Sequence, residues 1–256
     1  MAERPNWLSR LTGQAHRRPK VPEGVRVYAV GDIHGRRDLL ERLLELIWSD
    51  AAQTDARNTL VFLGDYVDRG PSSKEVVECL MALERPGWAI VALRGNHEHF
   101  FLEFLQNPEV YRVWREFGGG ETLRSYGVRP PSFDNPEEFA LAREKFVANV
   151  PASHLQFLKA LPLSHTAGDY LFVHAGVRPG IALERQSPDD LMWIRDEFLL
   201  SDRVLDKIIV HGHTPGERPV VRPNRICVDT GAYATDCLTA VTLSGGRCTF
   251  LCTSGT

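Results

Sequence analysis

The sequence predicts an α/β fold in which parallel strands are joined by helices. Three times within the first hundred residues, an apolar run leads into a short polar turn and then into a helix-forming segment. Repeated units of this kind favour parallel strands connected by right-handed crossovers. A length of 256 residues suits one well-buried domain, and the sequence contains no repeat or low-complexity block. We therefore expect a single α/β domain.

The three strand–turn–helix units share the same pattern. After the first turn, leucine and isoleucine recur at helical spacing. The second helix begins with Ser72 and Glu75 at the spacing of a capping box. The predicted strands span 25–30, 59–63 and 89–93, the turns span 31–35, 64–71 and 94–98, and the second helix spans 73–84.

After the third unit the pattern changes to helices and turns, interrupted by prolines and by the glycine run 118–120. Asn135, followed by Pro136, is typical of a helix start, and so is Ser153. We therefore expect a helical insertion over about residues 99–161. Inserted segments beside a site often shape access to it, so we assign substrate selection to this insertion as a hypothesis.

Strands return in the last third of the chain. Strand patterns at 170–173 and 207–210 are each followed by a histidine, and Ser187 between them begins a helix that carries Trp193 and Arg195. The sequence thus predicts further strands whose ends also present polar side chains.

The C-terminal segments 226–228 and 238–243 are expected to form a hairpin that completes a second sheet. Cys248 and Cys252 flank a further apolar strand pattern, where buried small side chains are favoured. The five cysteines are odd in number and include no C-x-x-C pair, so neither a disulfide framework nor a zinc ribbon is indicated. A reducing, cytoplasmic location fits this pattern best.

The charge pattern excludes several classes of partner. The net charge of -3 gives no electrostatic case for nucleic-acid binding, and no run of 18 apolar residues exists to span a membrane. Residues 1–22 are basic and lack the apolar segment of a secretory signal, so we expect a mobile tail before a catalytic domain at 23–256. Trp7, Leu8 and Leu11 allow the alternative of a short docking helix in this tail.

Polar side chains that can bind metals directly follow the predicted strands. They are Asp32, His34, Asp65, Asn96, His174, and His211 or His213. Carboxylate, amide oxygen and imidazole together suit hard and borderline divalent cations, and the absence of cysteine argues against a structural zinc site. Two metals about 3.5–4 Å apart need a shared ligand, and Asp65 is the natural bridge. The alternative for this turn is a capped loop with a surface ion pair between Asp68 and Arg69.

Five segments together resemble the motif set of the phosphoprotein phosphatase family of calcineurin-like metallophosphoesterases, with its bacterial-type serine/threonine protein phosphatases. They are GDIHG at 31–35, GDYVDRG at 64–70, RGNHE at 94–98, VHAG at 173–176 and VHGHT at 210–214. The resemblance covers about residues 25–100 and 165–243. It implies a four-layered α/β/β/α sandwich with a dinuclear metal centre.

The resemblance also implies the metal ligands. One metal would be held by Asp32, His34 and Asp65, and the other by Asp65, Asn96, His174 and His213. The first metal has three protein ligands because Pro215 stands where the wider superfamily often has another histidine. His213 matches the family position better than His211, which is expected beside the site. The cofactors expected are two divalent ions, Mn2+ first, with Fe or Zn as alternatives.

The same resemblance implies the residues that act on the substrate. Arg69, Arg94 and, less closely, Arg195 match the phosphate clamp. His97 is the candidate general acid for a poor alkoxide leaving group, and Asp68 is expected to orient it and favour its charged form.

The activity predicted is hydrolysis of phosphoserine or phosphothreonine in proteins by a hydroxide that two metals activate. One alternative is a nucleotide hydrolase resembling symmetrical diadenosine tetraphosphatases, which tend to carry Ala at the position of Asp68 and Asp at that of Glu98. The other is a non-catalytic scaffold on the same fold, which the intact set of ligands argues against. We expect a monomer or small homo-oligomer that acts on a phosphorylated protein or a small phosphoester.

Overall fold

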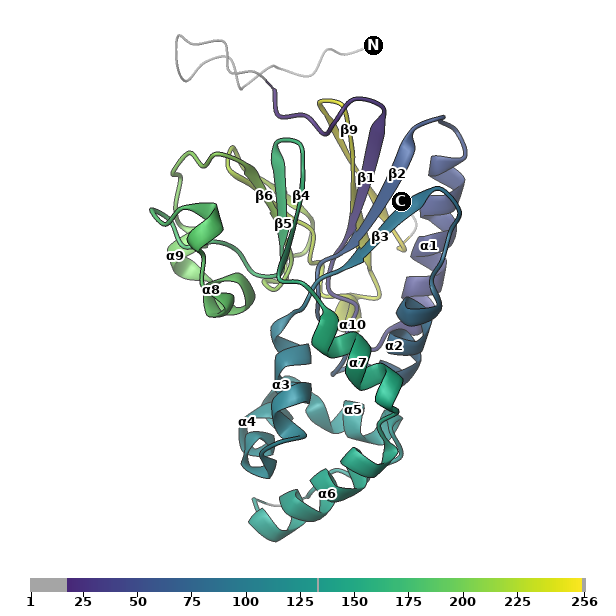
Figure 1. Ribbon diagram of the computed structural model, residues 1–256, viewed down its shortest axis with the longest axis vertical. Coiled ribbons are helices and arrows are strands. Elements are labelled where there is room, and N and C mark those ends of the chain that lie inside the picture. Colours follow the sequence, from purple (N-terminus) through teal and green to yellow (C-terminus); the bar gives the residue numbers. More distant parts are fainter. Residues whose placement is uncertain (1–17, 133, 255–256) are drawn as a thin grey trace.

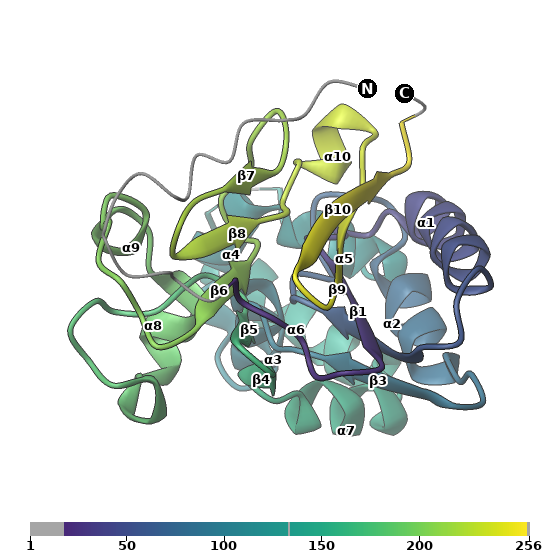
Figure 2. The same ribbon diagram turned by 90° about the horizontal axis from the view of Figure 1, so that it is seen from above.

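The computed structural model describes residues 18–132 and 134–254, which form two five-stranded sheets with helices on their outer faces (Figure 1). In the view from above, α1 and α2 lie outside one sheet, and α8 and α9 lie outside the other (Figure 2). This is the four-layered α/β/β/α arrangement that the sequence predicts. The basic tail predicted at 1–22 lies mostly outside the described residues, but Val21 is buried and pairs with the carbonyl of Gly245.

The first sheet contains the three predicted strand–turn–helix units. Its strand order is β10-β9-β1-β2-β3. Strands β1, β2 and β3 run parallel to one another, β9 runs antiparallel to β1, and β10 runs antiparallel to β9. The strands are β1 (Val25–Val30), β2 (Arg57–Phe62), β3 (Trp88–Ala92), β9 (Thr239–Ser244) and β10 (Arg247–Cys252), and the helices after the first three are α1 (Arg37–Ala51), α2 (Ser73–Ala82) and α3 (Asn96–Phe104). The three polar turns therefore meet at one edge of the sheet.

The second sheet brings the later histidines to the same place. Its strand order is β4-β5-β6-β8-β7, and β5, β6 and β8 are parallel. The strands are β4 (Ser164–Ala167), β5 (Tyr170–Val173), β6 (Ile208–His211), β7 (Val220–Val221) and β8 (Arg225–Cys227). On its outer face lie η4 (Leu183–Arg185), α8 (Pro188–Trp193) and α9 (Asp196–Leu199). As predicted, Ser187 caps α8 by accepting a hydrogen bond from the amide of Asp190.

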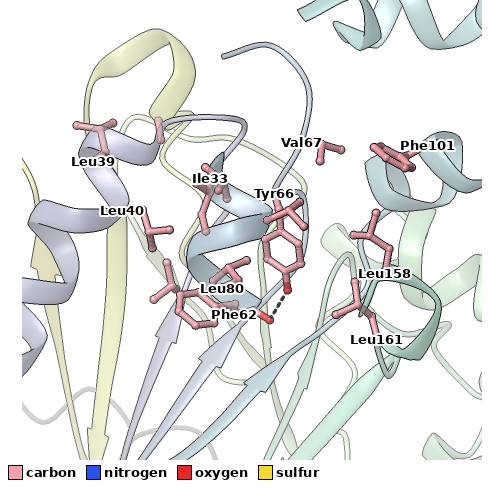
Figure 3. Packing of buried hydrophobic residues seen from close by; sticks show 14 of the residues in the cluster. Ile33, Leu39, Leu40, Phe62, Tyr66, Val67, Leu80, Phe101, Leu158 and Leu161 are labelled. Atoms are coloured by element: carbon pink, nitrogen blue, oxygen red, sulfur yellow. Dashed lines mark hydrogen bonds between the residues drawn. The ribbon is translucent and has the colours of Figure 1, made fainter. Parts of the chain in front are cut away.

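Apolar side chains fill the space between the layers. Val61 and Leu63 of the first sheet share a buried cluster with Phe172 and Val210 of the second. On the other face of the first sheet, α1 and α2 pack onto a larger cluster that includes Phe62 and the ring of Tyr66 (Figure 3). The Tyr66 hydroxyl donates to the carbonyl of Leu93 at 2.5 Å, which ties the second polar turn to the end of β3.

The helical insertion builds its own aromatic core. It contains the end of α3, then η2 (Pro108–Val110), α4 (Tyr111–Trp114), η3 (Arg115–Phe117), α5 (Gly119–Ser125), α6 (Pro136–Asn149) and α7 (Ala152–Ala160), and it lies below the sheets in Figure 1. Phe101, Phe104, Trp114 and Phe146 are fully buried there. Asn135 caps α6 as predicted, whereas α7 begins at Ala152, ahead of the predicted Ser153.

Three expectations were wrong. Segments 226–228 and 238–243 are not a hairpin, because α10 (Ala232–Thr235) carries the chain from β8 in one sheet to β9 in the other. Ser72 stands at the N-cap of α2 but its side chain makes no capping hydrogen bond, and the neighbouring Ser73 hydroxyl accepts from the amide of Asp68. Cys237 and Cys252 form a disulfide, which an odd cysteine count does not exclude.

Candidate metal centre

The polar turns at the strand ends have an unusual backbone. The non-glycine residues of the site with positive φ are His34, Asp65, Asp68, Arg69 and His213. Left-handed backbone is costly for such residues and persists where the surroundings hold it, commonly at functional sites. The turns are also packed closely, because a Cβ added to Gly95 would lie 2.2 Å from Oδ1 of Asp65. The sequence motifs therefore specify the close approach of these turns.

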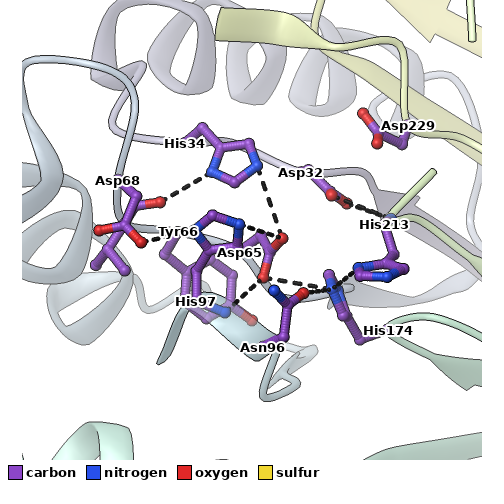
Figure 4. A network of polar contacts seen from close by, with 12 residues as sticks. Asp32, His34, Asp65, Tyr66, Asp68, Asn96, His97, His174, His213 and Asp229 are labelled. Atoms are coloured by element: carbon purple, nitrogen blue, oxygen red, sulfur yellow. Dashed lines mark hydrogen bonds and ion pairs between the residues drawn. The ribbon is translucent and has the colours of Figure 1, made fainter. Parts of the chain in front are cut away.

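Asp65 lies at the middle of the site, with histidines on two sides (Figure 4). Its Oδ2 is 3.6 Å from Nε2 of His34, and its Oδ1 is 3.3 Å from Nε2 of His174. The Nδ1 atoms of the two histidines donate at 2.9 Å to the carbonyls of Val67 and Leu63. These bonds fix the tautomers and leave both Nε2 atoms free to bind a metal, as in known metal sites.

Asn96 and His213 complete the group on the His174 side. Nε2 of His174 is 2.9 Å from Oδ1 of Asn96 and 3.1 Å from Nδ1 of His213. Nε2 of His213 is buried and has no hydrogen-bond partner among the described residues. Potential ligand atoms fall into two sets, each within 4.8 Å: His34, Asp65 and His97 in one, Asp65, His174 and His213 in the other. Two sets that share one carboxylate fit a pair of bridged cations.

Asp32 is placed differently from the other predicted ligands. Its two oxygens accept hydrogen bonds from the backbone amide of His213 at 3.1 and 3.0 Å, and it is in neither of those two sets. Burial raises the pKa of Asp32 well above its usual value, and the nearby charges of Asp229 and Asp65 raise it further. Divalent cations would offset this concentration of buried carboxylates.

Sequence reasoning missed Asp229, which is buried beside Asp32 and accepts a hydrogen bond from the amide of Gly231. The sequence does contain a signal for Asp229, because this residue comes shortly after β8, just as the predicted ligands come shortly after their strands. It also missed Tyr233, whose ring lies 4.5 Å from the guanidinium of Arg69. The sequence offers no comparable signal for this contact.

The surroundings of the site favour the neutral form of its histidines. Burial lowers the pKa of His174 to about 3 and that of His34 well below its usual value. It also lowers the pKa of His213, with the charge of His174 adding to the effect. Neutral imidazole is the form that binds metals, so the surroundings hold these side chains ready for ligation.

His97 and Asp68 form the predicted pair. Nδ1 of His97 is 2.6 Å from Oδ2 of Asp68, which also accepts a hydrogen bond from the indole of Trp114 at 2.7 Å. Burial lowers the pKa of His97, and the positive charges of Arg69 and Arg195 lower it further, so the charged form expected beside Asp68 stays a prediction. Burial also raises the pKa of Asp68 to about 7, so both groups are shifted toward their neutral forms.

The three predicted clamp arginines are not equivalent. The positive charge of Arg69 adds to the effect of burial in lowering the pKa of His34, and that of Arg195 does the same for His213. Both arginines also add to the effect of burial in lowering the pKa of His97, so each lies close to the ligand groups. In contrast, Nη2 of Arg94 donates to backbone carbonyls of Leu158 and Lys159, at 3.3 and 2.7 Å, where α7 ends. The structure ties Arg94 to the insertion.

His211 lies beside the site and is fully buried. Its Nε2 has no hydrogen-bond partner among the described residues, and its ring lies edge-on to that of Phe198, with 5.1 Å between the ring centroids. His211 belongs to neither set of clustered ligand atoms. Burial lowers its pKa to about 4. Over residues 18–132 and 134–254, no helix is long and apolar enough to cross a membrane.

Known proteins with similar sequences include enzymes named for nucleotide hydrolysis. A symmetrical bis(5'-nucleosyl)-tetraphosphatase of Dechloromonas aromatica is 32% identical over 152 residues, which cover 59% of this chain and 44% of the relative. The chain thus matches less than half the length of that relative. An asymmetrical bis(5'-nucleosyl)-tetraphosphatase, PrpE, of Oceanobacillus iheyensis is 25% identical, over 84% of this chain and 88% of the relative.

Solved structures with the same fold include proteins named for other activities. A cold-active protein-tyrosine phosphatase of Shewanella has a TM-score of 0.60 and 17% identity, and covers 99% of this chain and 88% of its own. A serine/threonine phosphatase of Saccharomyces cerevisiae has a TM-score of 0.53 and 16% identity, over 91% and 81%. At these identities the likeness shows the fold alone.

The family itself follows from a match over most of the chain. A family model described as calcineurin-like phosphoesterase matches residues 25–241, which include the second sheet, strands β1, β2 and β3 of the first sheet, and all the clustered histidines and carboxylates. The sequence motifs, the four-layered fold and the buried ligand groups agree with it. The chain belongs to the calcineurin-like phosphoesterase family.

Proposed function

We propose that this metallophosphoesterase hydrolyses phosphoanhydride bonds in nucleoside polyphosphates, with dinucleoside tetraphosphates as the first substrates to test. The observation that carries the proposal is an arginine beside each group of ligands. Arg69 lies against the ring of Tyr233, which is 5.5 Å from the ring of His34. Arg195 is two residues from Trp193, whose ring is 6.5 Å from that of His213. A polyphosphate presents anionic oxygens along its length, and guanidinium groups bind such oxygens in forked pairs. The names of the similar nucleotide hydrolases support the same substrate class.

The chain's residues have separable tasks in this reaction. Two divalent cations held by the ligand groups would lower the pKa of a water and so supply a nucleophile at neutral pH. Arg69 and Arg195 bind the phosphate oxygens and orient the phosphorus for in-line attack. The backbone carbonyls that accept from His34 and His174 keep the ligand nitrogens in place.

Phosphoserine and phosphothreonine hydrolysis, the activity predicted from the sequence, is the second candidate. One observation favours it: Nδ1 of His97 is 2.6 Å from Asp68, while its Nε2 is 3.6 Å from Asp65 at the centre of the site. A positioned histidine can pass a proton to a serine alkoxide, which leaves poorly without one. A nucleoside phosphate leaves as a stable anion and does not need this group.

The two candidates are separated by measuring kcat/KM of the Mn2+-loaded protein on diadenosine tetraphosphate, a phosphoserine peptide and p-nitrophenyl phosphate. We expect diadenosine tetraphosphate to have the highest value, and chromatography of the products distinguishes symmetrical from asymmetrical cleavage. Asp65→Asn is the control for contaminating phosphatases, because it removes the shared ligand. A phosphopeptide value above that for the dinucleotide would replace the first candidate by the second.

A further inference from the structure

Three aromatic side chains from separate elements meet beside the metal centre. Phe100 of α3 is 5.2 Å from Phe117 of η3 and 5.2 Å from Trp193 of α8, and Phe117 is 6.4 Å from Trp193, measured between ring centroids. We call Phe100, Phe117 and Trp193 the aromatic wall. It joins the helical insertion to the outer helices of the second sheet.

The aromatic wall contacts both sides of the candidate metal centre. The ring of Phe117 is 5.9 Å from that of His97, and the ring of Trp193 is 6.5 Å from that of His213. These distances allow no intervening layer of side chains. A substrate whose phosphorus is held between these two histidines would therefore carry its remaining atoms past the wall.

The two phosphate arginines adjoin the same wall. The backbone amide of Arg69 donates at 3.2 Å to the carbonyl of Gly118, the residue after Phe117. Arg195 follows Trp193 by two residues and is exposed. A phosphate bound by either arginine thus lies close to an aromatic ring.

The wall differs from the aromatic core of the insertion in its exposure. Phe101, Phe104 and Trp114 are fully buried, whereas Phe100, Phe117 and Trp193 are each half-buried. Folding alone favours complete burial of large rings. Rings that stay partly open next to a charged site can instead present a flat apolar surface to a ligand.

We propose that the aromatic wall stacks against a planar aromatic group of the substrate, the base of a nucleotide. This inference rests on the proposed function, and it assigns the base-binding surface to Phe117 and Trp193. Stacking on an aromatic side chain occurs with any of the bases and contributes about 5- to 150-fold in affinity. The arginines and ligand groups then bind the phosphates while the wall binds the base.

The test compares substrates with and without a base in Phe117→Ala and Trp193→Ala. We measure KM for diadenosine tetraphosphate and for inorganic tripolyphosphate, and expect the ratio of the two to rise roughly 10-fold in each variant. Trp193→Phe keeps a ring and should restore most of the ratio. Phe250→Ala is the matched control, because Phe250 is an exposed ring on the distant strand β10.

Failure of the wall and failure of the proposed function give different results. Equal changes of KM for both substrates would refute base stacking on the aromatic wall, because a purely structural role affects both substrates alike. If the wild type does not hydrolyse the dinucleotide, the proposed function fails. The aromatic wall is then tested by comparing KM for p-nitrophenyl phosphate, which has a ring, with KM for β-glycerophosphate, which has none. A raised KM for the aromatic ester alone supports stacking, and equal shifts refute it.

Discussion

Asp65 can serve two cations because its carboxylate oxygens point to different histidines. Oδ2 faces His34 and Oδ1 faces His174, and the backbone amide of His97 donates to Oδ1. Its neighbours at the site are fixed by backbone contacts, so the carboxylate cannot turn without losing them. A single residue therefore links the two ligand groups.

Replacement of this carboxylate should abolish metal binding. In Asp65→Asn, the amide supplies one neutral oxygen where a charged oxygen on each side is needed, so bound Mn2+ should fall from about two equivalents to below one. Elemental analysis after dialysis measures the content, and Asp189→Asn provides an exposed carboxylate as control. Full Mn2+ content in Asp65→Asn would refute the bridging role.

The arginines should separate into two classes when each is replaced by alanine. Arg69→Ala and Arg195→Ala remove charges beside the ligands, so kcat/KM should fall roughly 10²-fold and inhibition by inorganic phosphate should weaken. Arg94→Ala removes the bonds to Leu158 and Lys159, so its main effect should be a lower melting temperature. Phosphate inhibition and thermal unfolding of all three variants check this. A loss of phosphate inhibition in Arg94→Ala would show that Arg94 binds phosphate, as the sequence predicts.

The loss of kcat on replacing His97 should depend on the leaving group of the substrate. His97→Ala should cost about 10²–10⁴ in kcat on a phosphoserine peptide and much less on p-nitrophenyl phosphate, because nitrophenolate leaves without a proton. Asn96→Ala is the matched comparison: it strips a predicted metal ligand and should damage both substrates alike. Equal losses for His97→Ala would mean that the histidine supports the metal site instead of acting as the acid.

At the scale of an element, the turn after β2 is held by a residue from the next unit. Glu98 is fully buried, and its carboxylate accepts from the amides of Asp65 and Tyr66 at 2.9 and 2.7 Å and of Gly95 at 2.9 Å. These bonds stabilise the left-handed backbone that aims Asp65 at the histidines. The charge of one glutamate thereby shapes two turns of the site.

Loss of that charge should loosen the site. Glu98→Gln places an amide NH2 against backbone N–H donors, so it leaves at least one buried donor unpaired at a cost of about 1–3 kcal/mol. We expect a melting temperature lower by several degrees and weaker Mn2+ binding, although Glu98 is not a ligand. Calorimetry and metal titration test this, with the exposed Glu116→Gln as control. Unchanged Mn2+ affinity would contradict the positioning role.

Sequence patterns predicted the turns because their chemistry is local. Glycine, carboxylate and histidine after an apolar strand specify both the bend and the ligands, so Asp65 and His174 could be assigned. The partners of Glu98 are backbone amides as far as 33 residues away, which no spacing reveals. Arg94 is similar, because its bonds to α7 depend on how the insertion packs.

At the scale of the molecule, two sheets contribute to one centre, and the chain must cross between them. The strands β8 and β9 are short segments that are buried almost throughout, and such a segment identifies a strand and not its partner. The crossing segment includes Asp229, which lies beside Asp32, and Tyr233, which lies against Arg69 and His34. The predicted hairpin failed for this reason, whereas the layers themselves were predictable from the motif set.

The disulfide ties this crossing to the C-terminal strand, so reducing it should lower stability. Cys237 follows α10 and Cys252 ends β10, 15 residues later, and a closed loop of that size contributes about 3 kcal/mol. For a chain of this length we expect a reductant to lower the melting temperature by roughly 5–10 °C. Cys237→Ser should show the lower value without reductant and no further response, while Cys79→Ser, at a free cysteine, should respond like the wild type. Five titratable thiols in the untreated, denatured protein would show that the bond is absent and sink the prediction.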